Sequence, residues 1–245
     1  MAQGKAIATL ETMRTNNRWN VVGTLAVVAV AAGGCAHKQL DTGSLDEVER
    51  LAIVARVTAD PQVEAARVDP REGRAYPTAT PEEADQALAA ELKKQVSSFE
   101  LEERLRSAIV GRLPATPPWS NAMPSVEVAT ALDALLVEDR SGPPDYEALL
   151  AHGSNAVLEI EIERFGLHRV GTKTGLYLEG RGRLFKIEGG TLWKAPIKFD
   201  DARALEGESL DVVALRKGGY RDALIDLIGR VGETVAQELR GEQGR

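Results

Sequence analysis

Cysteine, histidine and aromatic residues are all scarce in this sequence of 245 residues. The single cysteine, Cys35, cannot form a disulfide within the chain. The three histidines, His37, His152 and His168, are scattered without the spacing of metal ligands, and no second cysteine accompanies them. No serine lies in a nucleophile elbow, and no residues assemble a recognisable triad. We therefore expect no metal, no cofactor and no catalytic residue.

Positive charge is also in deficit. The chain has a formal net charge of −7, and without residues 1–34 it carries 27 Lys and Arg against 36 Asp and Glu, near −9. Nucleic acids and anionic lipids are attracted by a positive overall field, which this chain does not have. We expect no nucleic-acid partner.

Only one apolar run is long enough to suggest a targeting segment. Val21–Ala32 carries no charge and follows Lys5, Arg14 and Arg18, with Glu11 as the one acid before it. A basic stretch, an apolar stretch and then small residues are the parts of a secretory signal. A membrane-spanning helix needs about 20 apolar residues, more than this run contains. An uncleaved membrane anchor and an ordinary signal peptide with an incidental cysteine are the two alternatives.

The residues before the cysteine, Ala31-Ala32-Gly33-Gly34-Cys35, resemble the lipobox of bacterial lipoproteins, although Ala32 stands where that family usually has Leu. The resemblance implies cleavage between Gly34 and Cys35 and acylation of the Cys35 thiol, so that lipid chains such as palmitate hold the protein on a membrane. Ala36 follows, with no Asp there, which in this family implies the outer membrane, facing the periplasm. We divide the chain into a signal peptide (1–34), a lipidated tether (35–44), a single α+β periplasmic domain (45–240) and a disordered tail (241–245).

Two features organise the first half of the domain. Leu51–Thr58 is a compact apolar run that predicts a buried strand, with a helix beginning near Ser44 as the alternative, and Gln62–Val68 suggests a second short strand. Thr80-Pro81-Glu82-Glu83 has the residues of a capping box and predicts the start of one long helix or two, with a break at Ser97-Ser98. Further helices are expected at Val126–Val137 and Asp145–His152.

The second half predicts three strands and a final helix. Ala156–Phe165 alternates apolar and acidic residues, Leu176–Ile187 follows a polar link over 166–175, and Leu192–Phe199 contains Pro196, which suits an edge strand. Tyr220–Leu239 predicts an amphipathic helix. The expected fold is α+β: an antiparallel sheet, made of a three-stranded meander plus an N-terminal strand, with helices packed on one face.

The polar residues of the strands have simple structural interpretations. Glu159, Glu161 and Glu163 share one strand face, and Arg181 and Arg183 share a face of the next strand. This arrangement predicts a solvated sheet face with cross-strand charge pairs. Gly180 and Gly182 match no phosphate loop and are expected to let a helix or another backbone come close. Trp119, in a proline-rich loop, is interpreted either as a partner contact or as a plug over the end of the core.

The C-terminal part also resembles a known group. Gly153-Ser154-Asn155-Ala156-Val157-Leu158, the strand end Phe165-Gly166-Leu167 and the later Leu192-Trp193-Lys194 are similar to envelope lipoproteins of the curli-channel, penicillin-binding-protein-activator and transporter-auxiliary types. The resemblance covers about residues 145–240. It implies a periplasmic domain that binds other envelope proteins or forms a homo-oligomer, and it carries over no catalytic residue. The membrane hairpins of the curli-type channel have no counterpart here.

These observations predict a membrane-tethered, non-enzymatic accessory or assembly factor of the cell envelope. A carrier of lipid or of a small apolar ligand is the first alternative, and it would need a deep apolar cavity. An envelope-anchored hydrolase is the second alternative, and it would need a polar cleft.

Overall fold

The computed structural model describes residues 37–64, 80–136, 144–204 and 208–241. In that part of the chain a five-stranded sheet is combined with helices, so the fold is α+β. The strands are β1 (Leu51–Val57), β2 (Gln62–Glu64), β3 (Ala156–Val170), β4 (Lys173–Lys186) and β5 (Thr191–Asp200). The helices are α1 (Pro81–Lys93), α2 (Ser98–Val110), α3 (Ser125–Leu136), α4 (Glu147–Ala151), α5 (Val212–Ala214) and α6 (Tyr220–Leu239).

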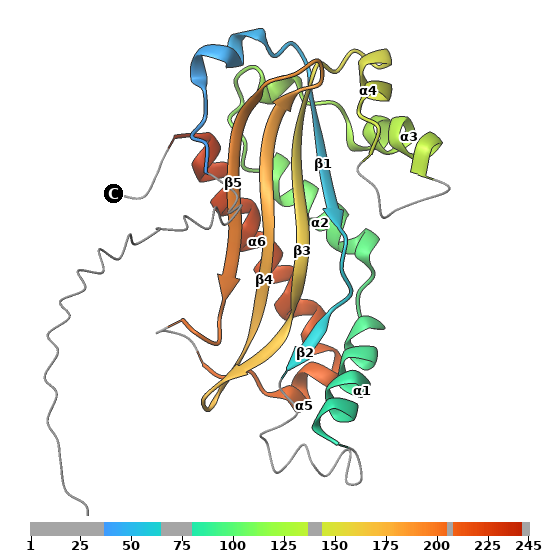
Figure 1. The fold of residues 1–245 in the computed structure, drawn as a ribbon, viewed down its shortest axis with the longest axis vertical. Coiled ribbons are helices and arrows are strands. Elements are labelled where there is room, and N and C mark those ends of the chain that lie inside the picture. The colour runs from blue at the N-terminus through green and yellow to red at the C-terminus, as the bar shows by residue number, and fades with distance from the viewer. Residues whose placement is uncertain (1–36, 65–79, 137–143, 205–207, 242–245) are drawn as a thin grey trace, which may run out of the picture. The chain divides into compact units, whose positions relative to one another are not determined.

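The sheet is mixed, which corrects the prediction of an antiparallel sheet. β3, β4 and β5 form the expected antiparallel meander, but β1 and β2 both pair with β3 in parallel. Alternating hydrophobicity indicates which face of a strand is buried. It does not distinguish parallel from antiparallel pairing with the neighbouring strand. The two parallel strands reach β3 through α1 to α4, the long crossover that parallel pairing requires (Figure 1).

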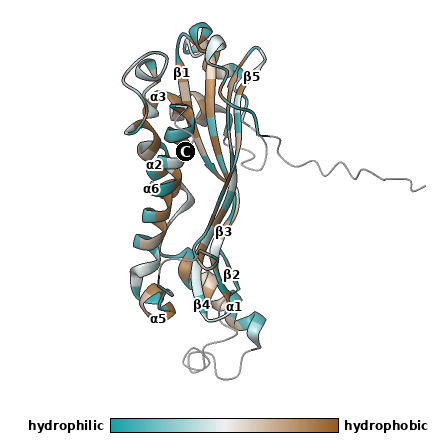
Figure 2. Cartoon of the chain, turned by 90° about the vertical axis from the view of Figure 1, so that its left-hand side faces the viewer, coloured by the Kyte–Doolittle hydropathy of each residue, from teal (hydrophilic) through white to brown (hydrophobic). Residues whose placement is uncertain are grey.

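One face of the sheet carries the main core. α2 and α6 lie side by side along this face (Figures 1 and 2). Apolar residues of β1, β3, β4 and β5 meet the inner faces of these helices and of α1. Trp193 packs over Gly182, where an added Cβ would lie 2.4 Å from the Trp193 ring. Gly180 fits the expectation of a close backbone, since a Cβ there would lie 2.2 Å from the carbonyl oxygen of Glu161.

The opposite face is covered at one end, which corrects the expectation that helices pack on one face alone. α3 and α4 form a second, smaller core with β1 and β3 there, to which Val128, Leu132, Leu149, Ala52 and Val157 belong. β1 therefore contributes to both cores, with five consecutive buried residues. A continuous apolar run is typical of a strand buried on both faces.

Local signals predicted most element boundaries. Thr80 accepts a hydrogen bond from the Glu83 amide (3.3 Å), and Glu83 accepts one from the Thr80 amide (2.7 Å), which confirms the capping box. Of the two alternatives, one long helix or two, the structure has two helices separated near Ser97-Ser98, and Ser97 caps the second by accepting a hydrogen bond from the Glu100 amide. Gly189 and Gly190, both with positive φ, make the hairpin turn between β4 and β5.

Two boundaries differ from the prediction. β3 continues through 166–170 and β4 begins at Lys173, so most of the predicted polar link is strand, with a register shift between Ile162 and Arg164. The helix alternative near Ser44 is only a short 3-10 helix, Thr42–Glu47, and β1 is a strand. In the segment predicted as a tether, Lys38 and Asp41 form backbone hydrogen bonds with β5.

Candidate docking groove

The polar face of the sheet is held together by ion pairs between β3 and β4. Glu159 lies directly opposite Arg183, and Glu161 directly opposite Arg181. Arg181 donates to the Glu161 carboxylate from Nε (2.9 Å) and from Nη2 (2.5 Å), while the Nε of Arg183 donates to Glu159. The cross-strand charge pairs predicted from the sequence are therefore present.

The predicted solvation of this face is wrong for two of its acids, since Glu159 is 1% exposed and Glu161 is 6% exposed. Two neighbours from other elements enclose them. Arg56 of β1 places its Nη1 3.5 Å from both carboxylates, and Tyr146, next to α4, donates its hydroxyl to Glu159. Neither neighbour is close to these acids in sequence, so a strand pattern alone could not reveal the burial.

The pKa directions of Arg181, Arg183 and Tyr146 fit two charged arginines and a neutral tyrosine. Hydrogen bonds to Glu161 raise the pKa of the Arg181 guanidinium. Burial disfavours the charged form of Arg183, but the hydrogen bond and negative charge of Glu159 outweigh it, and its pKa is also raised. Burial, reinforced by the Glu159 charge, raises the pKa of Tyr146, so its hydroxyl remains a neutral donor. The cluster thus links β1, β3, β4 and the start of α4.

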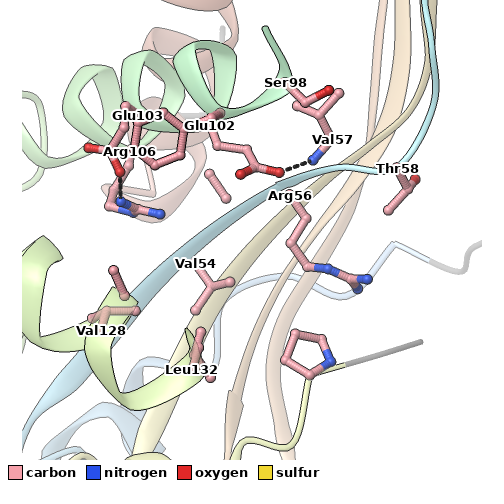
Figure 3. Close-up of a pocket in the computed structure, with 14 residues that line it drawn as sticks. Val54, Arg56, Val57, Thr58, Ser98, Glu102, Glu103, Arg106, Val128 and Leu132 are labelled. Atoms are coloured by element: carbon pink, nitrogen blue, oxygen red, sulfur yellow. Dashed lines mark hydrogen bonds and ion pairs between the residues drawn. The ribbon is translucent and has the colours of Figure 1, made fainter. Parts of the chain in front are cut away.

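Beside this cluster a groove follows the outer edge of β1, between α2 and α3 (Figure 3). It has a volume of about 240 Å³. We call it the β1 groove and define it by the residues that line it: Val54, Ala55, Arg56, Val57, Thr58, Ser98, Phe99, Glu102, Glu103, Arg106, Val128, Ala129, Leu132 and Pro144.

Charged side chains of the groove bond to other groups of the chain. Glu102 accepts a hydrogen bond from the backbone amide of Val57 (3.0 Å), and Arg106 donates to Glu103 (Figure 3). Arg56 is engaged with the two buried glutamates. Apolar side chains form the rest of the wall, among them Phe99, which is 65% exposed. The groove is therefore lined by apolar side chains and by charged side chains that are already bonded within the chain.

The residues singled out in the sequence lie in different places. Gly34 and Cys35 are outside the described residues. Trp119 is 7% exposed and belongs to the main core, so a partner could reach little of its side chain, and the burial fits the interpretation as a plug. His168 lies 2.7 Å from Asp200, a contact between β3 and β5 that becomes visible only once the strand register is known. In the described part of the chain no group of three or more His, Cys, Asp or Glu side chains is arranged to hold a metal ion.

No described helix combines the length and the apolar composition needed to cross a membrane.

No family model and no curated protein matches the chain. Two solved structures are similar in part. Lipoprotein GNA1162 from Neisseria meningitidis has 15% identity and a TM-score of 0.29, covering 74% of this chain and 98% of its own. The PelC dodecamer from Paraburkholderia phytofirmans has 10% identity and a TM-score of 0.22, covering 80% of this chain and 94% of its own.

Proposed function

We propose that this protein is a membrane-tethered lipoprotein of the bacterial cell envelope that acts as a non-enzymatic accessory or assembly factor through protein contacts. The observation that carries the proposal is the position of Cys35. The only cysteine of the chain follows an uncharged apolar run and four small residues, where a lipoprotein cysteine stands.

Acylation at Cys35 would hold the domain at a membrane surface, and this confinement is how the protein would act. Each buried CH₂ contributes about 0.8 kcal/mol, so two or three acyl chains hold a protein on a membrane where one chain binds only marginally. Confinement to a surface raises the effective concentration of the domain toward a partner in the same membrane. The tether therefore makes a weak contact sufficient. Ala36 favours the outer membrane, with the domain facing the periplasm.

The side chains of the polar sheet face support a binding role over a catalytic one. Glu159 and Glu161 are enclosed by arginines, and Tyr146 is a neutral donor to one of them. Such a cluster neutralises its charges and connects strands. A nucleophile would need a base aimed at it, which is a different arrangement.

The carrier alternative has weaker support. Ligand pockets for drug-sized molecules typically enclose about 300–1,000 Å³ and are mostly apolar. The β1 groove encloses about 240 Å³ and is lined by two arginines and two glutamates among its apolar residues. It suits a side chain better than a lipid.

Membrane fractionation tests the proposal. The full-length chain with its own leader and a Cys35→Ser variant would be expressed in a Gram-negative host, and each would be followed in membrane and soluble fractions. We expect the parent chain in the outer-membrane fraction and the variant in the soluble fraction. Equal distribution of the two chains would refute the tether.

A further inference from the structure

The first described residues of the chain are paired with β5. Lys38 and Lys194 exchange two backbone hydrogen bonds: the Lys38 amide donates to the Lys194 carbonyl (2.7 Å), and the Lys194 amide donates to the Lys38 carbonyl (3.0 Å). The Asp41 amide donates to the Leu192 carbonyl (2.9 Å), so residues 38–41 run antiparallel along the outer edge of β5 (Figure 1). The segment predicted as a tether is therefore fixed to the sheet from Lys38 onward.

This pairing leaves a very short connection to the cysteine. Three peptide units separate Cys35 from Lys38, and a chain spans at most about 3.6 Å per residue, so their Cα atoms lie within about 11 Å of each other. Acyl chains on Cys35 would enter the membrane and hold the outer edge of β5 at about that distance from its surface. Charges are screened over about 8 Å at physiological ionic strength, so this edge lies within reach of charged headgroups.

Three lysines lie together on this edge, which we call the lysine edge: Lys38, Lys194 and Lys198. Lys194 and Lys198 point to the same face of the sheet, because they are four residues apart on β5, and Lys38 lies directly opposite Lys194. Lys38 and Lys198 are exposed, and Lys194 is half-buried. Within the described residues none of the three forms an ion pair, and the amine of Lys38 donates to the carbonyl of Thr191.

Nearby acids on the same face of the sheet are engaged elsewhere. These acids are each paired with an arginine: Glu159, Glu161, Glu163, Glu179 and Asp200. Glu179 lies directly opposite Lys198, but its carboxylate is 3.1 Å from the guanidinium of Arg164. The lysine edge is therefore locally positive, although the chain has a net charge of −7.

We propose that the lysine edge docks on the anionic phospholipid surface of the membrane that holds Cys35. Each lysine near such a surface strengthens binding by roughly fivefold, and an acyl chain combined with a basic patch is a stable form of membrane attachment. The lipid would confine the domain to the membrane, and the lysines would determine which side faces it. The inference rests on the proposed function, since the acyl chains on Cys35 bring this edge to the lipid.

A strand of another protein is a poor match for the same edge. Residues 38–41 already occupy the backbone of β5 from Leu192 to Lys194. Beyond them Pro196 has no N–H and Lys198 is exposed, and proline and lysine on an edge strand oppose pairing with another chain. The exposed feature of the edge is its positive charge, which is complementary to anionic headgroups.

Lysine acetylation on vesicles tests the inference. Residues 35–245 contain every described helix and strand and form one compact unit. This chain would be coupled through Cys35, its only thiol, to a maleimide lipid in phosphatidylcholine vesicles with or without phosphatidylglycerol. Acetylation by an N-hydroxysuccinimide ester would be followed at each lysine by mass spectrometry.

We expect the lysine edge to react roughly fivefold more slowly, or slower still, on the vesicles that contain phosphatidylglycerol. The exposed Lys94 and Lys217 should react at the same rate on both kinds of vesicle. Salt at about 1 M should abolish the protection, because it shortens the screening length to about 3 Å.

Two double variants locate the contact. Lys194→Gln with Lys198→Gln removes two charges of the lysine edge and should return Lys38 toward its rate on phosphatidylcholine alone. Lys94→Gln with Lys217→Gln is the matched control, because it removes the same net charge from the end of α1 and from Leu215–Gly219. The control should leave the protection of Lys38 unchanged. All four side chains are at least partly exposed, so both variants should fold.

Equal acetylation of the lysine edge on the two kinds of vesicle would overturn the inference, and so would equal protection of Lys38 in the two double variants. The coupled lipid separates this test from that of the proposed function, because it supplies the anchor without acylation in a cell. Protection on vesicles together with an unacylated Cys35 in cells would refute the proposed function alone. An acylated Cys35 without protection on vesicles would refute this inference alone.

Discussion

The hydroxyl of Tyr146 donates a hydrogen bond to the carboxylate of Glu159, which is 1% exposed between β1 and β4. Removing one partner of a buried bond to a charged group leaves that group undersatisfied. We expect Tyr146→Phe to lower the free energy of unfolding by about 1–3 kcal/mol, measured by urea denaturation. Unchanged stability would mean that Arg56 and Arg183 suffice to hold the carboxylate.

Tyr220 provides the opposite case. Its side chain is fully buried against the main core, and its hydroxyl has no hydrogen-bond partner in the described part of the chain. Replacing an unsatisfied buried hydroxyl by hydrogen removes a penalty. Tyr220→Phe should therefore leave stability unchanged or raise it by about 1 kcal/mol in the same denaturation experiment. A loss as large as that expected for Tyr146→Phe would show that the hydroxyl is bonded.

The two tyrosines also predict a loss of stability in alkali. Burial raises the pKa of Tyr146 and of Tyr220 above the ordinary value of about 10. Below pH about 10 both hydroxyls keep their protons in the folded and unfolded chain, so their contribution is fully present. At higher pH only the unfolded tyrosines ionise, and each lowers the free energy of unfolding by about 1.4 kcal/mol per pH unit.

The measurement is urea unfolding at about pH 9 and about pH 11 for the parent, Tyr220→Phe and the double Tyr146→Phe, Tyr220→Phe variant. The parent should lose most stability over this interval and the double variant least. Equal losses in all three chains would assign the alkaline effect to other groups.

Two glycines of α6 should respond oppositely to alanine. A Cβ at Gly232 would lie 2.7 Å from the Cβ of Ala108 on α2, whereas a Cβ at Gly229 would meet nothing within 4 Å. Gly232→Ala should separate α2 from α6 and destabilise the protein by about 1–3 kcal/mol. Gly229→Ala is the matched control and should stabilise by up to about 1 kcal/mol, because alanine favours the helix. Thermal unfolding of both variants tests the α2–α6 contact, and equal effects would contradict it.

Much of the fold was predictable because its signals are local. The capping box at Thr80 and the edge position implied by Pro196 depend on neighbouring residues, and the structure has both of them. The helix Tyr220–Leu239 has the predicted bounds. Its apolar stripe recurs at helical spacing, and the same residues face the main core.

The features of the fold and of the candidate site that the sequence did not predict depend on contacts between segments that are distant in the chain. The parallel direction of β1 follows from the crossover through α1 to α4, and a strand pattern does not contain it. The burial of Glu161 follows from Arg56, more than one hundred residues earlier in the chain. The β1 groove likewise combines α2, α3 and a strand edge, so no single stretch of sequence indicates it. One signal was available: the unbroken apolar run Leu51–Ala55 already indicated a strand covered on both faces.

The most direct test of the account is the intact mass of the mature protein. The full-length chain, expressed with its own leader and extracted from membranes, would be measured beside Cys35→Ser. We predict a mass that begins at Cys35 and includes a diacylglyceryl group and an N-linked acyl chain, and no such product from the variant. A mass that still includes residues 1–34, or one without lipid, would contradict the tethered function.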